Sequence, residues 1–546
     1  MTNQPYIKGK AKVLVDAEKP LGKLRRMWRY IGYDEINYTT TPNGEATLKK
    51  FMELEKSPYY VRAHHLLCTG NGRGIPKWGS TNVYIEDGKG VPIYNWRVID
   101  EIFDTYQRCN LKPFVELGFM PRDLADDRGQ PSHLWWYGGW SCPPKDYKKW
   151  YSLIYDLVKH CADRYGLEEA STWYWELWNE PDIDYYWKGS FDEYCKLYDY
   201  TAAAIESALP EAKIGGPAAT GPRFDRKSAE WLDKFLDHCV SGRNYLTGSR
   251  GTRMDFITFH AKGAGYKAKF FTEKQLPSIK RLLSQVKLGL DIVEKYPSLK
   301  GVKCILSECD PDGMAAYGMW DNANLEFRNT EYYPSYVVAA FKKLMDLSDS
   351  YCRELEALTW AFMFEGERCF EGTRTFTTHG IDKPILNLFR MYSFMGDTRL
   401  SFVSSVAKDP LNYKDDYGLD EEPDIDGFAS MSGNRRVEIL LFCHHADWDV
   451  KGEYDVEIEV TSVPFDGFEA LLTHYRIDQT HSNAYTEWIR QGRPNYPTRA
   501  QTRMIRSREN LELYEPRHQV TVQGGKFKKI ITLPVHGISL LILSRK

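Results

Sequence analysis

Short apolar runs alternate with longer amphipathic segments over the first two thirds of the chain, and this alternation restricts the possible folds most. The runs are rich in β-branched and aromatic residues, which favour buried strands, and the segments between them repeat apolar residues at helical spacing. The eight predicted strands cover residues 28–38, 59–72, 112–121, 171–180, 212–219, 254–263, 302–309 and 357–367. Eight consecutive strand–helix units predict the α/β class and a (β/α)₈ barrel.

The pattern changes after about residue 398. Strands now follow one another without long helices, which is typical of a β-sandwich; they are predicted at 437–445, 454–463, 467–477, 518–524, 528–535 and 538–544. Residues 5–15 form a further strand. We therefore expect an N-terminal strand segment (1–27) that packs on the sandwich, a catalytic barrel (28–397) and a β-sandwich (398–546). The acidic stretch 415–427 lacks the spacing of a calcium loop and is predicted to be a surface loop.

Composition excludes several classes of protein. The net charge of −3 gives no indication of nucleic acid or an anionic membrane surface as a partner. No apolar run reaches the length of a membrane span, and the first residues lack a secretory signal. The 11 cysteines are an odd number without a CxxC pair, so we expect reduced, buried thiols and a cytoplasmic location. No motif indicates a nucleotide, another cofactor or a catalytic metal, and a homo-oligomer remains possible.

Two acidic residues are predicted at the ends of barrel strands. Glu180 follows Asn179 in a Trp-Asn-Glu-Pro motif that ends the fourth strand, and Glu308 ends the seventh. In a closed barrel these strand ends face each other, and two carboxyls flanking one bond can hydrolyse a glycoside. A separation of about 5–5.5 Å indicates a retaining enzyme, and about 6.5–9.5 Å an inverting one. Asn179 would bind the sugar 2-hydroxyl, and His260 would orient Glu308 or the sugar. The alternative for these residues is a structural role at strand ends.

Several segments together resemble glycoside hydrolase family 39. They are YYVRAHHLL, PFVELGFMP, the WNEP motif, the order of barrel and sandwich, and HYRIDQTHSNAYTEWIRQGRP at 474–494. The resemblance implies that Glu180 is the acid/base and Glu308 the nucleophile of a retaining enzyme that needs no cofactor. It also implies that the 474–494 segment is structural and that Trp488 packs the sandwich against the barrel.

The family's two best-known activities, β-D-xylosidase and α-L-iduronidase, differ in whether carbon 5 of the sugar carries a carboxylate. After strand six this chain has His260-Ala-Lys262-Gly-Ala, which resembles the iduronidase pattern, in which the lysine binds the uronate. Arg374 is a second candidate cation. Strand eight carries Glu365, which resembles the xylosidase side and is a further candidate for substrate binding. The alternative for Lys262 is an ion pair with an acid such as Glu308 or Glu365.

Other aromatic and histidine side chains are weaker candidates. His64 and His65 would touch sugar hydroxyls or be buried and bonded to the backbone. Trp135, Trp136, Trp140, Trp320 and Trp360 would stack on sugar rings or belong to the core. We predict a retaining exo-glycosidase that releases a terminal β-D-xylosyl or C5-carboxylated residue from an oligosaccharide. The alternatives are a non-catalytic carbohydrate-binding protein on the same scaffold and an enzyme for another linkage, such as an arabinosidase.

Overall fold

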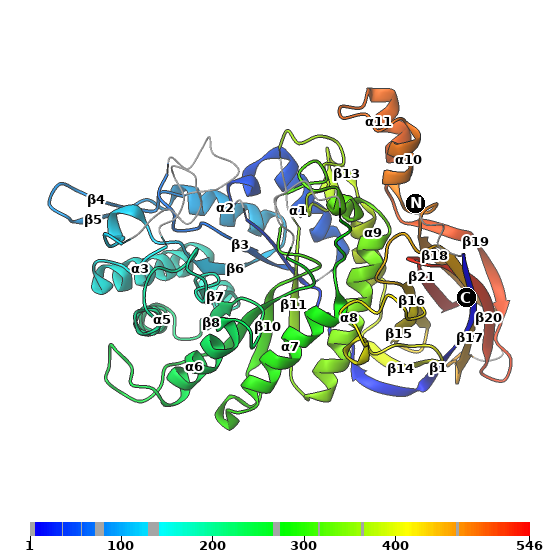
Figure 1. Cartoon of the computed structure of the whole chain (residues 1–546), viewed down its shortest axis with the longest axis horizontal. Helices are drawn as coiled ribbons and strands as arrows, with labels where there is room; N and C mark the ends of the chain where they lie inside the picture. Colours follow the sequence, from blue (N-terminus) through cyan, green and yellow to red (C-terminus); the bar gives the residue numbers. More distant parts are fainter. Residues whose placement is uncertain are drawn as a thin grey trace.

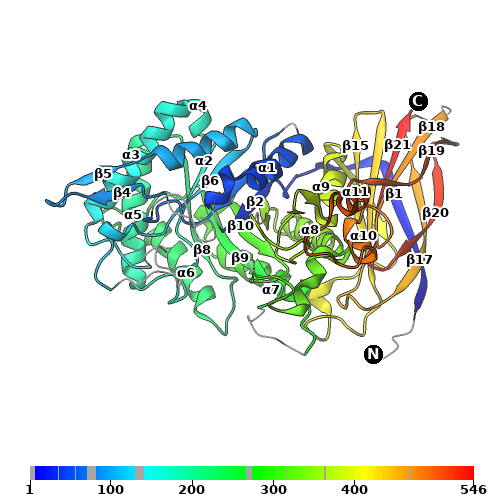
Figure 2. The ribbon, with the colours of Figure 1, turned by 90° about the horizontal axis from the view of Figure 1, so that it is seen from above.

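The computed structural model describes residues 6–34, 36–55, 57–70, 81–128, 141–265, 273–314, 317–361, 365–465 and 469–546. Eight parallel strands close into a barrel at one end of the molecule, and a large sheet forms the other end (Figures 1 and 2). In order around the barrel, the strands are β2 (Tyr30–Tyr33), β3 (Tyr60–Ala63), β6 (Lys112–Leu117), β7 (Tyr174–Leu177), β8 (Lys213–Ala219), β9 (Phe256–Lys262), β10 (Lys303–Asp310) and β11 (Leu355–Trp360). The predicted (β/α)₈ barrel is confirmed.

Helices follow the barrel strands and cover their outer faces. They are α1 (Pro42–Leu54), α2 (Arg97–Arg108), α3 (Tyr147–Tyr165), α4 (Leu167–Ala170), α5 (Phe191–Ala208), α6 (Lys227–Ser241), α7 (Ile279–Val293), α8 (Tyr332–Ser350) and α9 (Pro384–Ser393). The start of α5 shows how the sequence determines where a helix begins. The Ser190 hydroxyl accepts from the Glu193 N–H at 3.1 Å, and the Glu193 carboxylate accepts from the Ser190 N–H at 2.8 Å. This capping box satisfies two backbone donors that the helix leaves free.

Several barrel strands end earlier than predicted. β2 ends at Tyr33, β3 at Ala63 and β7 at Leu177, so the polar residues that follow them lie on loops at one rim of the barrel. Below this rim, aromatic rings fill the barrel: Tyr30 stacks on Tyr60 with centroids 5.1 Å apart, and Tyr174 contacts Phe256 at 5.0 Å. The barrel interior is therefore packed, and the space for a ligand is at the carboxyl ends of the strands.

The second domain is one nine-stranded, mostly antiparallel sheet. Its order is β19 (Glu512–Thr521), β18 (Glu469–Ile477), β21 (Ile538–Arg545), β16 (Arg436–His444), β15 (Asp424–Ser432), β14 (Thr398–Ser404), β1 (Ile7–Lys23), β17 (Gly452–Thr461) and β20 (Phe527–Pro534). The sheet folds over a single apolar core, and Arg476 of β18 donates to the Thr532 carbonyl of β20 at 3.1 Å. The N-terminal strand lies within it, antiparallel to β14 and parallel to β17.

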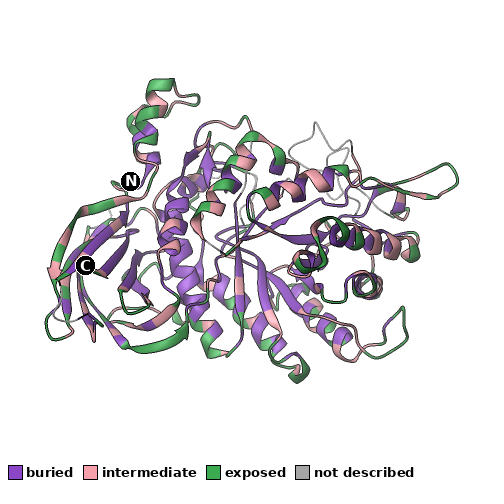
Figure 3. Ribbon diagram, turned by 180° about the vertical axis from the view of Figure 1, so that it is seen from behind, coloured by how far each residue is buried: buried purple, intermediate pink, exposed green. Residues whose placement is uncertain are grey.

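Helix α8 lies between the barrel and the sheet, and Figure 3 shows it as buried over most of its length. Lys343 of α8 forms ion pairs with Asp424 at 3.1 Å and with Asp426 at 2.7 Å. Both aspartates are buried in β15. The prediction of a surface loop over 415–427 is therefore wrong for 424–427, because the lysine of a distant helix compensates the acidic charges.

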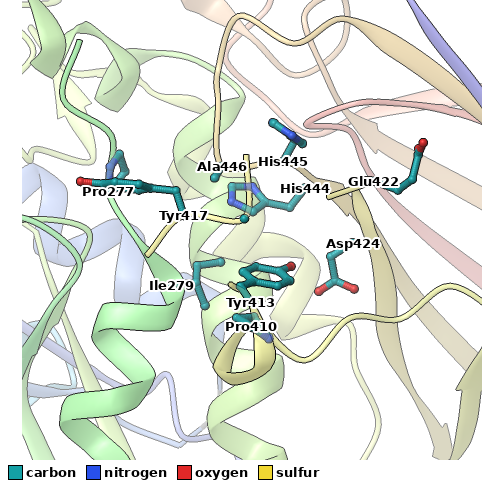
Figure 4. A pocket seen from close by; sticks show the side chains of 11 residues that line it. Pro277, Ile279, Pro410, Tyr413, Tyr417, Glu422, Asp424, His444, His445 and Ala446 are labelled. Atoms are coloured by element: carbon teal, nitrogen blue, oxygen red, sulfur yellow. The ribbon is translucent and has the colours of Figure 1, made fainter. Parts of the chain in front are cut away.

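A small cavity of about 20 Å³ lies at the same junction (Figure 4). Ile279 of α7 borders it from the barrel, and Tyr413, Asp424 and His444 border it from the sheet domain. His444 is buried, and its Nδ1 atom lies 3.0 Å from the Ser335 hydroxyl of α8. This histidine is therefore part of the packing between the two domains.

Two short helices, α10 (Ala484–Arg490) and α11 (Arg499–Arg506), connect β18 to β19 and project from the body in Figure 1. Trp488 of α10 is fully buried, with its ring 5.3 Å from that of Phe370 in the segment after β11. Trp488 thus attaches this part of the sheet domain to the barrel. The remaining elements are the hairpins β4 (Tyr84–Glu86)/β5 (Pro92–Tyr94) and β12 (Thr377–Thr378)/β13 (Ile381–Asp382) and the 3₁₀ turns η1 (Ile36–Thr40), η2 (Arg122–Leu124), η3 (Pro297–Leu299), η4 (Ala323–Asn329) and η5 (Pro410–Asn412).

All cysteines are free thiols, and ten of the 11 are buried as expected; Cys352, two residues after α8, is exposed. Among the helices of the described ranges, none has the length and apolar character needed to cross a membrane.

Candidate active site

A cavity of about 740 Å³ opens at the carboxyl ends of the barrel strands. Glu180 reaches it from the loop after β7, and Glu308 reaches it from β10. One carboxylate oxygen of each acid and one ring nitrogen of His260 lie within 4.8 Å of one another. The two acids predicted from the strand ends are therefore brought together, with 128 residues of chain between them.

The backbone around Glu180 is strained. Trp178 and Glu180 have φ angles of 67° and 46°, in the left-handed region that non-glycine residues rarely adopt. The Glu180 N–H donates to the Ala218 carbonyl at 2.9 Å, and the Trp178 indole donates to the Tyr186 carbonyl at 2.9 Å. Such conformations cost roughly 1–3 kcal/mol each and persist where the surroundings hold them. Here they turn the Glu180 side chain toward the cavity.

Glu308 lies among cationic side chains. Lys262 Nζ is 2.6 Å from one carboxylate oxygen, and Arg62 and His64 are 3.2 and 3.3 Å from the other. Burial alone would raise the pKa of Glu308, but the charges of His260, Lys262 and His64 outweigh it and hold this pKa well below its ordinary value. Glu308 is therefore ionised at neutral pH.

Arg62 lies beneath the two acids and was not among the predicted site residues. It is fully buried on β3, with guanidinium nitrogens 2.5 Å from Glu176 and 2.9 Å from Glu116. It also donates to the Asn179 side-chain oxygen at 3.0 Å. Asn179 lines the cavity, and this bond fixes its amide so that the NH₂ group remains available to a ligand. The arginine within the apolar run YYVRA could have been identified from the sequence, because a charge on a buried strand must be paired with other charged groups.

His64 and Asp34 extend this network along the cavity wall. His64 Nε2 lies 3.2 Å from Asp34, and Nδ1 is in short contact with Glu116. Burial would lower the pKa of His64, but Glu116 outweighs burial and raises this pKa to about 10. Burial raises the pKa of Asp34 to about 6. His64 was a weaker candidate from its sequence position, whereas Asp34 had no predicted role although it directly follows a barrel strand.

Three predicted substrate-binding residues, His65, His260 and Glu365, are not among the residues that line the cavity. His260 is fully buried and contacts Glu180 at 2.8 Å. His65 has a φ of 69°, and its ring is buried, 5.4 Å from that of Phe119 and 6.1 Å from that of His64. Glu365 instead accepts hydrogen bonds from the backbone and the side chain of Asn43, at 2.8 and 2.7 Å. None of the three residues is part of the cavity wall, so their expected contact with the sugar is not supported by the geometry.

Lys262 and Arg374, the two candidate cations, both line the cavity. They converge on Asp310, with Lys262 Nζ at 2.5 Å and an Arg374 nitrogen at 2.8 Å. Burial would lower the pKa of Lys262, but Asp310 and Glu308 outweigh it and raise this pKa. The alternative of an ion pair between Lys262 and Glu308 is thus present, and Asp310, rather than Glu365, is the second partner.

The two candidate tryptophans that the structure describes differ in position. Trp360 lines the cavity, and its ring centroid lies 5.2 Å from that of His64. Trp320 is 45% exposed, contacts Arg368 and is not part of the wall. Trp135, Trp136 and Trp140 lie outside the described residues.

Glu180, His260 and Glu308 are close enough together to share a metal ion. The cations Lys262 and Arg62 already contact Glu308, however, and their charge opposes the binding of a metal ion there. The same groups suit a reaction in which carboxylates act directly on a sugar.

A (β/α)₈ barrel with two carboxylates facing each other at its catalytic rim is the arrangement of a glycoside hydrolase. The chain belongs to glycosyl hydrolases family 39, and the sequence model of this family matches residues 11–524. It is 28% identical over 470 residues to a β-xylosidase of Geobacillus stearothermophilus (84% of this chain, 81% of the relative). It is 24% identical over 562 residues to an α-L-iduronidase of Mus musculus (95% and 78%). The solved structure of a bacterial orthologue of human α-L-iduronidase shares the fold, with a TM-score of 0.78 at 20% identity, covering 99% of this chain and 84% of that one.

Proposed function

We propose that this glycoside hydrolase is a retaining exo-enzyme that works by double displacement. The observation that carries the proposal is the approach of Glu180 and Glu308 oxygens to within 4.8 Å. This is below the distance of about 6.5–9.5 Å that an inverting enzyme needs to place a water between its two acids.

In the first step, a Glu308 oxygen attacks the anomeric carbon while Glu180 gives its proton to the departing oxygen. The sugar is then bound to Glu308 as an ester, and the leaving group departs as an alcohol. In the second step, Glu180 takes a proton from water, the water oxygen attacks the anomeric carbon, and Glu308 leaves as a carboxylate. His260, which contacts Glu180 at 2.8 Å, orients this acid in both steps. The Asn179 amide donates to the 2-hydroxyl.

For the released sugar we propose a residue with a carboxylate at carbon 5, of the iduronate type. Lys262 and Arg374 supply two cations on the wall beside Glu308. A carboxylate bound by a charged donor gains about 1.5–3 kcal/mol, enough to select one sugar over another by one to two orders of magnitude.

A terminal β-D-xylosyl residue is the second candidate, and a specific observation favours it. Lys262 already has two carboxylate partners, Glu308 and Asp310, so a uronate would compete with them. A sugar with only hydrogen at carbon 5 leaves both pairs intact.

The test compares hydrolysis of 4-methylumbelliferyl α-L-iduronide and β-D-xyloside by the wild type and by Lys262→Ala. Because Lys262 also contacts Glu308, the informative quantity is the ratio of the two kcat/KM values. A loss confined to the iduronide supports the carboxylate site. Hydrolysis of the xyloside alone supports the second candidate. Lys287→Ala, on the outer face of α7 with a side chain 49% exposed, is the matched control. If the enzyme hydrolyses neither substrate, both sugars are excluded.

Product stereochemistry tests the retaining mechanism itself. Proton NMR of the first-formed sugar should show the anomer of the substrate, before mutarotation mixes the two. The opposite anomer would contradict the proposal.

A further inference from the structure

The part of the cavity wall nearest the opening carries three arginines, Arg223, Arg226 and Arg281. The side chains of Arg223 and Arg281 are 35% and 34% exposed, and Arg226 is exposed. The acidic residues that line the described wall are Asp34, Glu180 and Glu308, whose side chains are all less than one fifth exposed. In the buried part of the wall these acids lie together with the cations Lys262 and Arg374, whereas the described residues of the exposed part include the three arginines and no acid.

Two of these arginines lie on the Glu180 side of the cavity. They belong to the loop between β8 and α6, which is tied to the loop carrying Glu180. The Glu180 N–H donates to the Ala218 carbonyl at 2.9 Å, and the Thr220 N–H donates to Asp182 at 2.8 Å. Glu180 is the group that protonates the departing oxygen in the proposed reaction. The leaving group must therefore extend past Glu180 toward these arginines.

The arginines have more positive charge than their partners neutralise. Arg223 forms an ion pair with Asp225, and the nearby Arg226 also lowers the pKa of this aspartate, after the larger effect of Arg223. Arg226 has no ion pair of its own with a described residue. Two guanidinium groups thus share one carboxylate. Arg281, at the start of α7, reaches Asp416 only at 3.4 Å.

We propose that this outer wall binds an acidic leaving group, a sugar unit that carries a carboxylate. The inference rests on the proposed function, because it takes Glu180 as the acid that faces the leaving group. A guanidinium group presents paired N–H donors that match the two oxygens of a carboxylate. The three arginines would select substrates by the charge of the leaving group, which departs in the first step, independently of the terminal sugar.

The test uses two aryl glycosides of whichever terminal sugar the enzyme releases, one with a 4-carboxyphenyl and one with a 4-carbamoylphenyl leaving group. These groups match in size and differ in charge. We expect kcat/KM to favour the carboxylate roughly fivefold, the effect of one partly exposed ion pair. The preference should decrease with added salt. In Arg223→Gln, Arg226→Gln and Arg281→Gln combined, the ratio should fall to about one.

Arg490→Gln, on α10 with a side chain 74% exposed, is the control and should keep the wild-type ratio. Equal hydrolysis of both compounds by the wild type would overturn the proposal, and so would a preference that survives in the triple variant. If neither compound is hydrolysed, the proposed function fails and this inference fails with it.

Discussion

The Nδ1 atom of His260 lies 2.8 Å from a Glu180 oxygen and 3.8 Å from a Glu308 oxygen. The sequence left open whether His260 orients the nucleophile or the sugar, and the hydrogen bond instead reaches the other acid. His260 is on β9, which adjoins β10 in the barrel, so its choice of Glu180 is not a consequence of strand order. It depends on the strained loop that turns Glu180 across the cavity.

Replacing His260 with Gln should impair the steps in which Glu180 transfers a proton. We expect kcat/KM to fall about 10²-fold or more on glycosides with poor leaving groups. The loss should be much smaller on 2,4-dinitrophenyl glycosides, because dinitrophenolate leaves without protonation. The measurement is the dependence of kcat/KM on leaving-group pKa. The control is His160→Gln. His160 lies on α3 and is paired with Asp100 of α2. An equal loss across all leaving groups would show that His260 does not act through Glu180.

Replacing Glu308 with Ala should abolish turnover, because no nucleophile remains. Sodium azide fits the space left by the carboxylate and should restore activity on an activated glycoside, with a glycosyl azide of inverted configuration as the product. The measurement is NMR of that product. Glu294→Ala, on the outer side of the barrel after α7 and 46% exposed, should retain full activity without azide. Absence of rescue in a folded Glu308→Ala protein would count against the nucleophile assignment.

Replacing Arg62 with Met should destabilise the whole barrel. Three buried carboxylates, Glu116, Glu176 and Glu308, would lose their shared cation. Removing one partner of a buried ion pair typically costs about 3–5 kcal/mol, which urea denaturation would measure. Arg62→Lys should recover part of this stability, because the charge remains. A Met variant as stable as the wild type would mean that the acids are protonated in its place.

Acid should weaken the packing between barrel and sheet through His444 (Figure 4). Burial lowers the pKa of His444 to about 3, against an ordinary value of about 6.5. Between these values the unfolded chain binds a proton that the folded protein excludes, so the stabilising contribution of neutral His444 is lost as pH falls from about 6.5 to about 3. The slope of melting temperature against pH in this window should be shallower in His444→Gln. An unchanged slope would assign the acid sensitivity to other groups.

The sequence located Glu180 and Glu308 because each follows or ends a strongly apolar run, and strand ends converge in a barrel. It could not distinguish His64 from His65, because the positive φ that separates them is a property of the folded loop. Arg62 was missed because its partners come from three other strands. The acidic residues Asp424 and Asp426 were taken for a loop because their partner, Lys343, is some 80 residues away. For Arg62, Asp424 and Asp426 the missing information was a contact between distant segments, and for the two histidines it was a backbone conformation.

The position of β1 has a consequence for how the chain is made. This first strand must pair with β14 and β17, which lie about 390 and 445 residues later. While the ribosome synthesises the barrel, residues 7–23 have no partner strands and expose both hydrogen-bonding edges. The barrel is complete in the chain before the sheet can close, so nascent molecules carry an unpaired strand through most of translation. A chaperone that shields the edges of unpaired strands would act on this segment first.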